Sequence, residues 1–314
     1  MKFAFVFPGQ GSQSVGMLTA YGAAAAISET LVEASDALGQ DLTAMIAEGP
    51  AELLNQTVNT QPAMLAAGVA VYRLWQSQGG PAPAMMAGHS LGEYTALVCA
   101  GALGFADAIK LVRLRAEAMQ SAVPEGVGAM AAVLGLDDDA VRAVCAEAVQ
   151  GEHQNEVLAA VNFNSPGQVV IAGHKAAVER GCALAKARGA KRALPLPVSV
   201  PSHCALMQPA AEKLRLALAE IEIKTPSVTV LHNADVVSHA DPVAIRDALT
   251  RQLFSPVRWV ETVQSFAAQG IQFVAECGPG KVLAGLNKRI VDGLPGVALA
   301  DAAALTDTLA KVRS

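Results

Sequence analysis

The sequence Ala84-Met85-Met86-Ala87-Gly88-His89-Ser90-Leu91-Gly92-Glu93-Tyr94 joins a short apolar run, a Gly-x-Ser-x-Gly motif and the start of a helical pattern. In a nucleophile elbow a serine occupies a sharp strand-to-helix turn, and glycines flank it because side chains there would collide with the neighbouring strand and helix. Gly88 and Gly92 stand in those places. Ser90 is therefore a candidate nucleophile. The backbone N–H of Leu91, at a helix N-terminus, is expected to face a developing oxyanion.

An ordinary tight turn is the alternative interpretation, because this spacing arises by chance in roughly one chain of this length in ten. The context favours the elbow. Pro81 and Pro83 mark the start of the apolar run, and a helical pattern continues from Glu93 without a breaker until Gly101. We therefore favour an exposed nucleophile at Ser90.

Composition restricts the class of protein. The 314 residues are 52% hydrophobic and 16% charged, which is enough to bury a large core in one domain or in two unequal ones. A net charge of -5 without a long basic run makes nucleic acid an unexpected partner. Five scattered cysteines predict neither a disulfide framework nor a zinc cluster, and they fit a reducing cytoplasm. No apolar run is long enough for a membrane span or a signal peptide, so we expect no membrane partner.

Alternating strand and helix patterns predict an α/β fold with one mostly parallel sheet. Phe3 to Phe7 is apolar throughout, as is typical of a central buried strand, and a Gly-rich loop containing Gln10 follows it. A helix is expected over Gln61 to Gln78, with Pro62 in its first turn. After residue 205 the alternation resumes, with a helix over Lys281 to Val291 near its end.

The middle of the chain has a different pattern, β-α-β-β-α-β, which is the order of a ferredoxin-like unit. Its second strand is expected at Val157 to Val161, and prolines at its exit keep the chain extended. We therefore predict an inserted subdomain at residues 126–195. Residues 1–125 and 196–314 would form the larger subdomain.

A serine nucleophile needs a base, because an alcohol is protonated at neutral pH. His89 is interpreted as structural, since neighbouring residues at such a turn point in different directions. Three histidines follow extended or apolar stretches and remain equal candidates: His203, His232 and His239. Three acids lie near strand ends and are equally undistinguished as partners of the base: Asp235, Glu276 and Asp301.

Seven motifs spread over the chain identify a resemblance. They are Phe7-Pro8-Gly9-Gln10-Gly11-Ser12-Gln13, Thr60-Gln61-Pro62-Ala63, Gly88-His89-Ser90-Leu91-Gly92-Glu93-Tyr94, Arg115, Asn162-Phe163-Asn164-Ser165-Pro166-Gly167-Gln168, Pro201-Ser202-His203 and Gly278-Pro279-Gly280-Lys281. In this set the sequence resembles the malonyl-CoA:acyl carrier protein transacylases, bacterial enzymes that load malonyl groups for fatty acid synthesis. The resemblance implies an α/β-hydrolase-like large subdomain with an inserted ferredoxin-like small one.

The resemblance also implies roles for individual residues. Ser90 corresponds to the nucleophile and His203 to its base, while the backbone amides of Leu91 and Gln10 correspond to the oxyanion hole. A backbone carbonyl orients the histidine in this family, and the matching position is Gln252. A neutral carbonyl fixes the tautomer but stabilises an imidazolium less than a carboxylate does.

For the substrate, the resemblance assigns Arg115 to the free malonyl carboxylate, which a planar guanidinium can grip through two hydrogen bonds. Arg113 is then expected to be solvated. Asn162 and Asn164 are expected to bind the pantetheine arm or the acyl group, with an asparagine-rich turn as the alternative.

The implied reaction is a ping-pong exchange from malonyl-CoA to the phosphopantetheine thiol of acyl carrier protein, through a malonyl-serine ester. Both ends of the exchange are thioesters of the same arm, so it should be nearly thermoneutral and need no metal and no cofactor; malonyl-CoA itself is a substrate. The alternatives are a serine hydrolase, a related acyltransferase of a polyketide or malonate-decarboxylase system, and a scaffold without activity.

Because the chain is net negative, an acidic carrier must be attracted locally. A basic rim is the expected docking surface, with solvated surface charges as the alternative. Its candidates are Lys186, Arg188, Lys191, Arg192, Lys281, Lys288 and Arg289.

Overall fold

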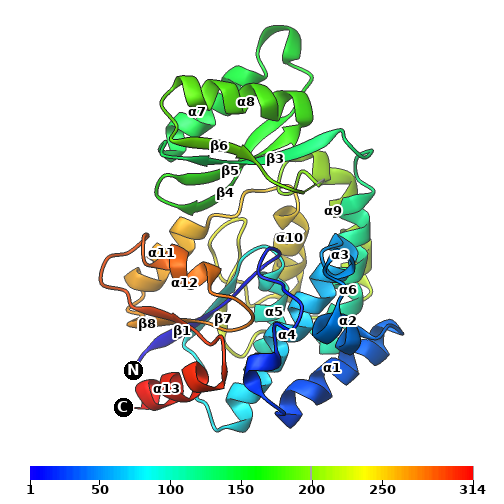
Figure 1. Ribbon diagram of the computed structural model, residues 1–314, viewed down its shortest axis with the longest axis vertical. Coiled ribbons are helices and arrows are strands. Elements are labelled where there is room, and N and C mark those ends of the chain that lie inside the picture. The colour runs from blue at the N-terminus through cyan, green and yellow to red at the C-terminus, as the bar shows by residue number, and fades with distance from the viewer. Residues whose placement is uncertain (199, 314) are drawn as a thin grey trace.

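The computed structural model describes residues 1–198 and 200–313, which form a five-stranded and a four-stranded sheet with helices packed around them (Figure 1). The strands of these residues are β1 Phe3–Phe7, β2 Met85–Gly88, β3 Gly128–Leu134, β4 Leu158–Ser165, β5 Gln168–His174, β6 Arg192–Pro195, β7 Thr229–Leu231, β8 Phe273–Glu276 and β9 Gly296–Ala298. The α-helices are α1 Ala25–Leu38, α2 Leu42–Glu48, α3 Ala51–Leu54, α4 Thr57–Ser77, α5 Gly92–Cys99, α6 Phe105–Gln120, α7 Asp138–Ala148, α8 Lys175–Ala187, α9 Gln208–Ala219, α10 Pro242–Gln252, α11 Trp259–Ala268, α12 Val282–Asn287 and α13 Ala302–Arg313.

The larger sheet is parallel, in the order β7-β2-β1-β8-β9, so β1 is its central strand as the sequence predicts. Successive residues of β1 point to opposite faces. Phe3, Phe5 and Phe7 belong to one hydrophobic core with residues of α1, α4, α6 and α9. Ala4 and Val6 belong to a second core with residues of α11 and α12. Helices therefore cover both faces, which explains why this strand is apolar throughout.

The smaller sheet is antiparallel, in the order β4-β5-β3-β6. Its helices α7 and α8 lie together on the side away from the larger sheet (Figure 1). The mixed α/β fold, with a parallel sheet and a separate small antiparallel sheet, is confirmed. All four strands fall within residues 126–195, and the division into subdomains at these boundaries stays a prediction.

Some elements differ from the prediction. Helix α4 begins at Thr57, so Pro62 is its sixth residue and does not lie in the first turn as predicted. Without an N–H group, Pro62 leaves one helical hydrogen bond unmade. Helix α2 was not predicted, because its seven residues are too few for a clear periodicity. Helix α12 ends at Asn287, four residues before the predicted end. Strand β4 continues to Ser165, which places Asn162 and Asn164 on a strand and excludes the asparagine-rich turn.

The two sheets meet where the site forms. Carboxyl ends of parallel strands lie at one edge of a sheet, and loops leaving that edge carry functional groups. Here β1, β2 and β7 lead to the loop at Gln10, to the turn at Ser90 and to Asn233. The smaller sheet is joined through β4 to the segment between α10 and α11: Val257 N–H donates to Val161 O at 2.8 Å, and Phe163 N–H donates to Val257 O at 3.0 Å.

Candidate active site

Ser90 lies at the turn between β2 and α5, with a left-handed backbone φ of 52°. The turn has no room for side chains at positions 88 and 92. A Cβ atom on Gly88 would lie 1.8 Å from the carbonyl carbon of Gly92, and one on Gly92 would lie 2.0 Å from the carbonyl oxygen of Phe7. A left-handed conformation at a residue other than glycine is strained and persists only where its surroundings hold it. The stretch therefore adopts the elbow that its sequence predicts.

His203 contacts the serine directly, with its Nε2 atom 2.8 Å from Ser90 Oγ. Its Nδ1 atom is 2.8 Å from the backbone oxygen of Gln252. Because a carbonyl only accepts, Nδ1 carries the proton and Nε2 turns its lone pair to the hydroxyl. The backbone N–H of His203 donates to Leu253 O at 3.0 Å. This arrangement holds the imidazole in the tautomer that a general base requires.

The surroundings of His203 keep it neutral. Burial, and next the positive charge of Arg115, lower the pKa of His203 to about 3. The carbonyl of Gln252 opposes this shift by accepting from the ring. At neutral pH the imidazole is therefore unprotonated and able to take a proton from Ser90.

Arg115 is a cation enclosed beside Ser90. The residue is 1% exposed, and its Nη2 atom donates to Ser90 Oγ at 3.2 Å. Its other hydrogen bonds go to neutral amide oxygens, Gln61 Oε1 at 2.7 Å and Gln252 Oε1 at 3.1 Å. Burial lowers the pKa of Arg115, but a guanidinium starts so high that it remains charged. The site thus holds a buried positive charge that an anionic substrate group could neutralise.

Leu91 and Gln10 carry the backbone amides predicted for the oxyanion hole. Leu91 immediately precedes α5, and Gln10 lies in the loop after β1. Among the described residues, neither backbone N–H donates to a protein acceptor. Both residues line the same cleft as Ser90. Two free donors near a nucleophile are what stabilisation of a tetrahedral oxyanion needs.

The cleft has a volume of about 540 Å³ and lies between the two sheets. Ser90, Arg115 and His203 line one side, and Met130 and Asn162 of the smaller sheet line the other. Asn162 Oδ1 is buried and has no hydrogen-bond partner within the described part of the chain. An unpaired buried oxygen in a cleft is a place where a ligand donor can bind.

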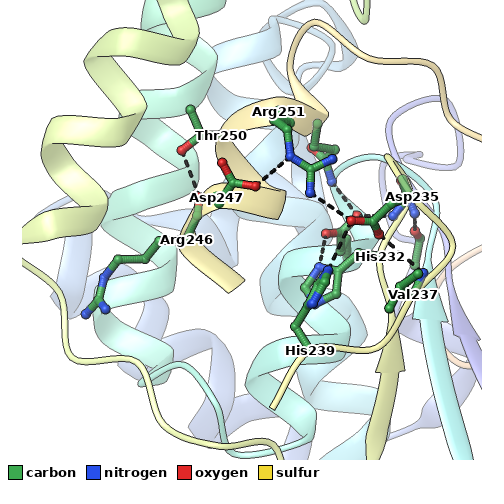
Figure 2. A network of polar contacts seen from close by, with 12 residues as sticks. His232, Asp235, Val237, His239, Arg246, Asp247, Thr250 and Arg251 are labelled. Carbon is green, nitrogen blue, oxygen red and sulfur yellow. Dashed lines mark hydrogen bonds and ion pairs between the residues drawn. The ribbon is translucent and has the colours of Figure 1, made fainter. Parts of the chain in front are cut away.

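The other candidates for the base and its acid partner lie elsewhere. His232 Nδ1 is 2.7 Å from Glu93 Oε1. His239 is 3.0 Å from Asp235, which also accepts from Arg251 (Figure 2). The two remaining acids bind backbone N–H groups: Glu276 accepts from Ala284 and Asp301 from Ala304. Of the three equal histidines, the structure brings only His203 to Ser90.

Two further expectations are decided by contacts. His89 Nε2 is 2.8 Å from Asn164 Oδ1, so this histidine joins the elbow to β4 and Asn164 faces His89. The expectation that Arg113 is solvated is wrong. Its side chain is half-buried and donates to the side-chain oxygens of Gln40 and Asn59. Arg113 lies on α6, and its side chain is covered because α6 packs against α1 and α4.

Sequence reasoning missed three residues that contact the site. Gln61 holds Arg115, Glu93 accepts from Gln252 Nε2 at 2.8 Å, and Asn233 Oδ1 accepts from Ser90 N–H at 2.7 Å. Gln61 and Glu93 belong to motifs that carry the resemblance, so a signal for them existed. Asn233 follows β7 without any motif, and only the fold brings it to the elbow.

The seven basic residues of the predicted rim are all exposed. Arg188 forms an ion pair with Glu147, and Arg289 donates to Gln168 Oε1 at 2.6 Å. The contact of Arg289 joins the segment after α12 to the start of β5. The use of this rim for docking stays a prediction.

Two kinds of feature were not found in residues 1–198 and 200–313. No cluster of three or more His, Cys, Asp or Glu side chains is arranged to hold a metal ion. None of the helices there combines the length and apolar character needed to cross a membrane.

Comparison with known proteins places the chain in a family. Residues 4–304 match the model of the acyl transferase domain. The malonyl CoA-acyl carrier protein transacylase of Escherichia coli strain K12 is 61% identical over 309 residues, which cover 98% of this chain and 99% of that protein.

Solved structures agree with this placement. The acyl-carrier-protein S-malonyltransferase of Burkholderia pseudomallei 1710b superimposes with a TM-score of 0.96 at 61% identity, over 99% of this chain and 100% of that one. A malonyl-transacylase solved in complex with a type II polyketide synthase acyl-carrier protein has a TM-score of 0.96 at 55% identity, over 99% of this chain and 100% of that one. The resemblance inferred from seven motifs is thereby confirmed over the whole chain.

Proposed function

The chain belongs to the acyl transferase domain family, and we propose that it transfers a malonyl group from malonyl-CoA to the phosphopantetheine thiol of an acyl carrier protein. The names of its 61%-identical relatives support this reaction. One observation carries the choice of acyl group: a buried guanidinium lies 3.2 Å from the nucleophilic oxygen and is paired only with neutral oxygens among the described residues.

The first half-reaction forms an ester on Ser90. His203 Nε2 takes the hydroxyl proton while Ser90 Oγ attacks the malonyl thioester carbon. The oxyanion is stabilised by the backbone N–H groups of Leu91 and Gln10. The carbon–sulfur bond then breaks, and the imidazolium returns its proton to the leaving CoA thiolate.

The second half-reaction reverses the first with a different thiol. His203 takes the proton of the phosphopantetheine thiol, whose sulfur attacks the malonyl-serine ester. The carbon–oxygen bond breaks, and Ser90 Oγ recovers the proton from His203. Both substrates are thioesters of the same kind of arm, so the exchange is close to thermoneutral and reversible. It needs no metal, nucleotide or redox cofactor.

Arg115 selects the acyl group. A malonyl carboxylate replaces the weak neutral acceptors of the guanidinium with a charge-assisted, bidentate pair. An acetyl group leaves the buried cation without a directly bound carboxylate, at a cost of about 2 to 5 kcal/mol. Asn162 lies across the cleft. It binds the pantetheine arm, whose amide N–H groups can donate to its unpaired oxygen, or the acyl group, whose oxygens can accept from its side-chain NH₂.

The carrier protein docks at the basic rim, because overall charge repels an acidic partner from a chain of net charge -5. We place the enzyme in the cytoplasm, where it supplies malonyl groups to fatty acid elongation. A polyketide carrier is the alternative recipient, since a relative of 55% identity was solved with one.

Intact mass spectrometry tests the proposal. With malonyl-CoA alone, a transferase stops as a stable adduct of one malonyl group, and adding holo carrier protein removes the adduct and yields malonyl-carrier. A serine hydrolase instead releases free malonate continuously without a carrier. Continuous release would overturn the proposal, and exclusive transfer to a polyketide carrier would change the assigned pathway.

A further inference from the structure

A buried polar cluster contacts the elbow without lining the cleft. It consists of Glu93, His232 and Asn233, and we call it the Glu93 cluster; its members are at most 1% exposed. The carboxylate accepts from three donors: His232 Nδ1 at 2.7 Å, Asn233 N at 2.9 Å and Gln252 Nε2 at 2.8 Å. A carboxylate has enough lone pairs for three donors, so Glu93 holds all of them at once.

Two of these three partners hold the backbone of the nucleophile. Asn233 Oδ1 accepts from Ser90 N–H at 2.7 Å, and Gln252 Nε2 donates to Ser90 O at 3.0 Å. Asn233 also donates to Gly88 O at 2.7 Å. Both polar backbone groups of the left-handed serine are therefore bound by residues that Glu93 binds in turn, Asn233 through its backbone N–H and Gln252 through its side chain. Strained backbone persists only where such contacts over-determine it.

Gln252 extends the cluster to the other site residues. Its Nε2 faces two acceptors, Glu93 and Ser90 O, so its Oε1 must point the other way, to Arg115 at 3.1 Å. Its backbone oxygen holds His203 Nδ1 at 2.8 Å. One residue thus connects the buried carboxylate with the base and with the guanidinium.

An outer layer of contacts supports the same two segments. Figure 2 shows Asp235, in the loop after β7, facing Arg251 on α10; Arg251 Nη2 donates to Asp235 Oδ2 at 2.7 Å. Arg251 Nε also donates to Asp247 at 2.6 Å. The pair joins the loop that carries Asn233 to the helix that ends at Gln252.

We propose that Glu93 and Asn233 are positioning residues for the transfer reaction. They hold Ser90 in its left-handed conformation and hold Gln252 in the orientation that serves His203 and Arg115. Neither residue contacts Ser90 Oγ, so they act through the serine backbone and through Gln252. This inference rests on the proposed function.

Glu93→Met tests the inference with little change of side-chain volume. Methionine has no oxygen acceptor, so the hydrogen bonds to Asn233 and Gln252 are lost together with the one to His232. We expect the single-turnover rate of Ser90 acylation by malonyl-CoA to fall about 10- to 100-fold, as for a site group displaced by less than 1 Å. Far-ultraviolet circular dichroism and the melting temperature measure the folded fraction, so that acylation rates are compared per folded molecule. If the unmodified enzyme itself forms no adduct, the proposed function fails and not this inference.

Glu276→Met is the matched control. Glu276 is also a buried carboxylate at the carboxyl end of a strand of the same sheet, but it binds the backbone N–H of Ala284, away from Ser90. We expect it to lower the melting temperature while the acylation rate per folded molecule stays within twofold. An acylation rate of Glu93→Met within twofold of the unmodified enzyme would overturn the inference.

Asn233→Ala keeps the test decisive if the Glu93 variant does not fold. It removes the side chain that binds Ser90 N–H, and we expect a loss of acylation rate of similar size. In the double variant the losses should not multiply, because both act through the same serine backbone. Fully multiplicative losses would show that the two residues act independently and would contradict the proposal.

Discussion

The two walls of the cleft are built differently. On the side of the parallel sheet, Ser90, His203, Arg115 and Gln252 are joined to one another by hydrogen bonds, and the backbone of Ser90 is held on both sides. On the side of the smaller sheet, Asn162 presents a buried oxygen without a partner among the described residues. The first wall is preorganised for chemistry, whereas the second keeps a polar group available for a ligand.

Loss of the nucleophile should be the largest effect and would confirm that the chemistry lies on the first wall. Ser90→Ala should abolish the malonyl adduct, and His203→Ala should slow its formation by roughly 10⁴- to 10⁶-fold, because the serine then has no base. Intact mass over time measures both. A malonyl adduct that persists in Ser90→Ala would disprove the assignment.

Removing the buried cation should come next. Arg115→Ala should lower malonyl transfer by about 30- to several-thousand-fold relative to acetyl transfer, since only malonyl loses a charge pair. The measurement is kcat/KM for both acyl-CoA substrates. Equal losses for malonyl and acetyl would make Arg115 a structural residue of the first wall.

The second wall should respond more weakly. Asn162→Ala should raise KM for malonyl-CoA by about 2- to 15-fold with kcat nearly unchanged, because one uniform binding contact is lost. Steady-state kinetics separate the two constants. A loss confined to kcat would move Asn162 into the chemistry and remove the difference between the walls.

The rim should affect the carrier alone. Reversing Lys288 and Arg289 to Glu should raise KM for carrier protein by about 2- to 10-fold, more at low salt than at high salt, while acylation by malonyl-CoA is unchanged. Kinetics at two salt concentrations measure this. Carrier kinetics that match the unmodified enzyme at both would exclude this part of the rim as the docking surface.

A change of pH between 5 and 8 should have the smallest effect on the first wall, because it should not change the protonation of His203. Because the pKa of His203 is lowered to about 3, the ring binds a proton only far below its ordinary pKa and stays neutral between pH 5 and 8. Nuclear magnetic resonance titration of the ring in the free enzyme should show no midpoint in that interval. A midpoint near 6.5 would mean that the first wall does not enclose the base as the geometry indicates.

Much of this molecule could be predicted from sequence. The apolar Phe3–Phe7 predicted a central strand, and the β-α-β-β-α-β order predicted a small antiparallel sheet, because local periodicity reflects which faces are buried. Element ends were less reliable, as with α4, where Pro62 does not mark the start. Short elements such as α2 carry too few residues for periodicity to detect.

The sequence by itself indicated the elbow and its candidate nucleophile, because Gly88 and Gly92 stand at the two positions beside Ser90 where such a turn leaves no room for a Cβ atom. It also determined, through the resemblance, which positions to examine for the base and the guanidinium. The tertiary structure alone decided that Asn233 and Glu93 meet at the elbow, that Arg113 is held by Gln40 and Asn59, and that Asn162 keeps an unpaired oxygen. These contacts join residues far apart in the chain, and their partners depend on strand order and helix packing, which local patterns do not encode.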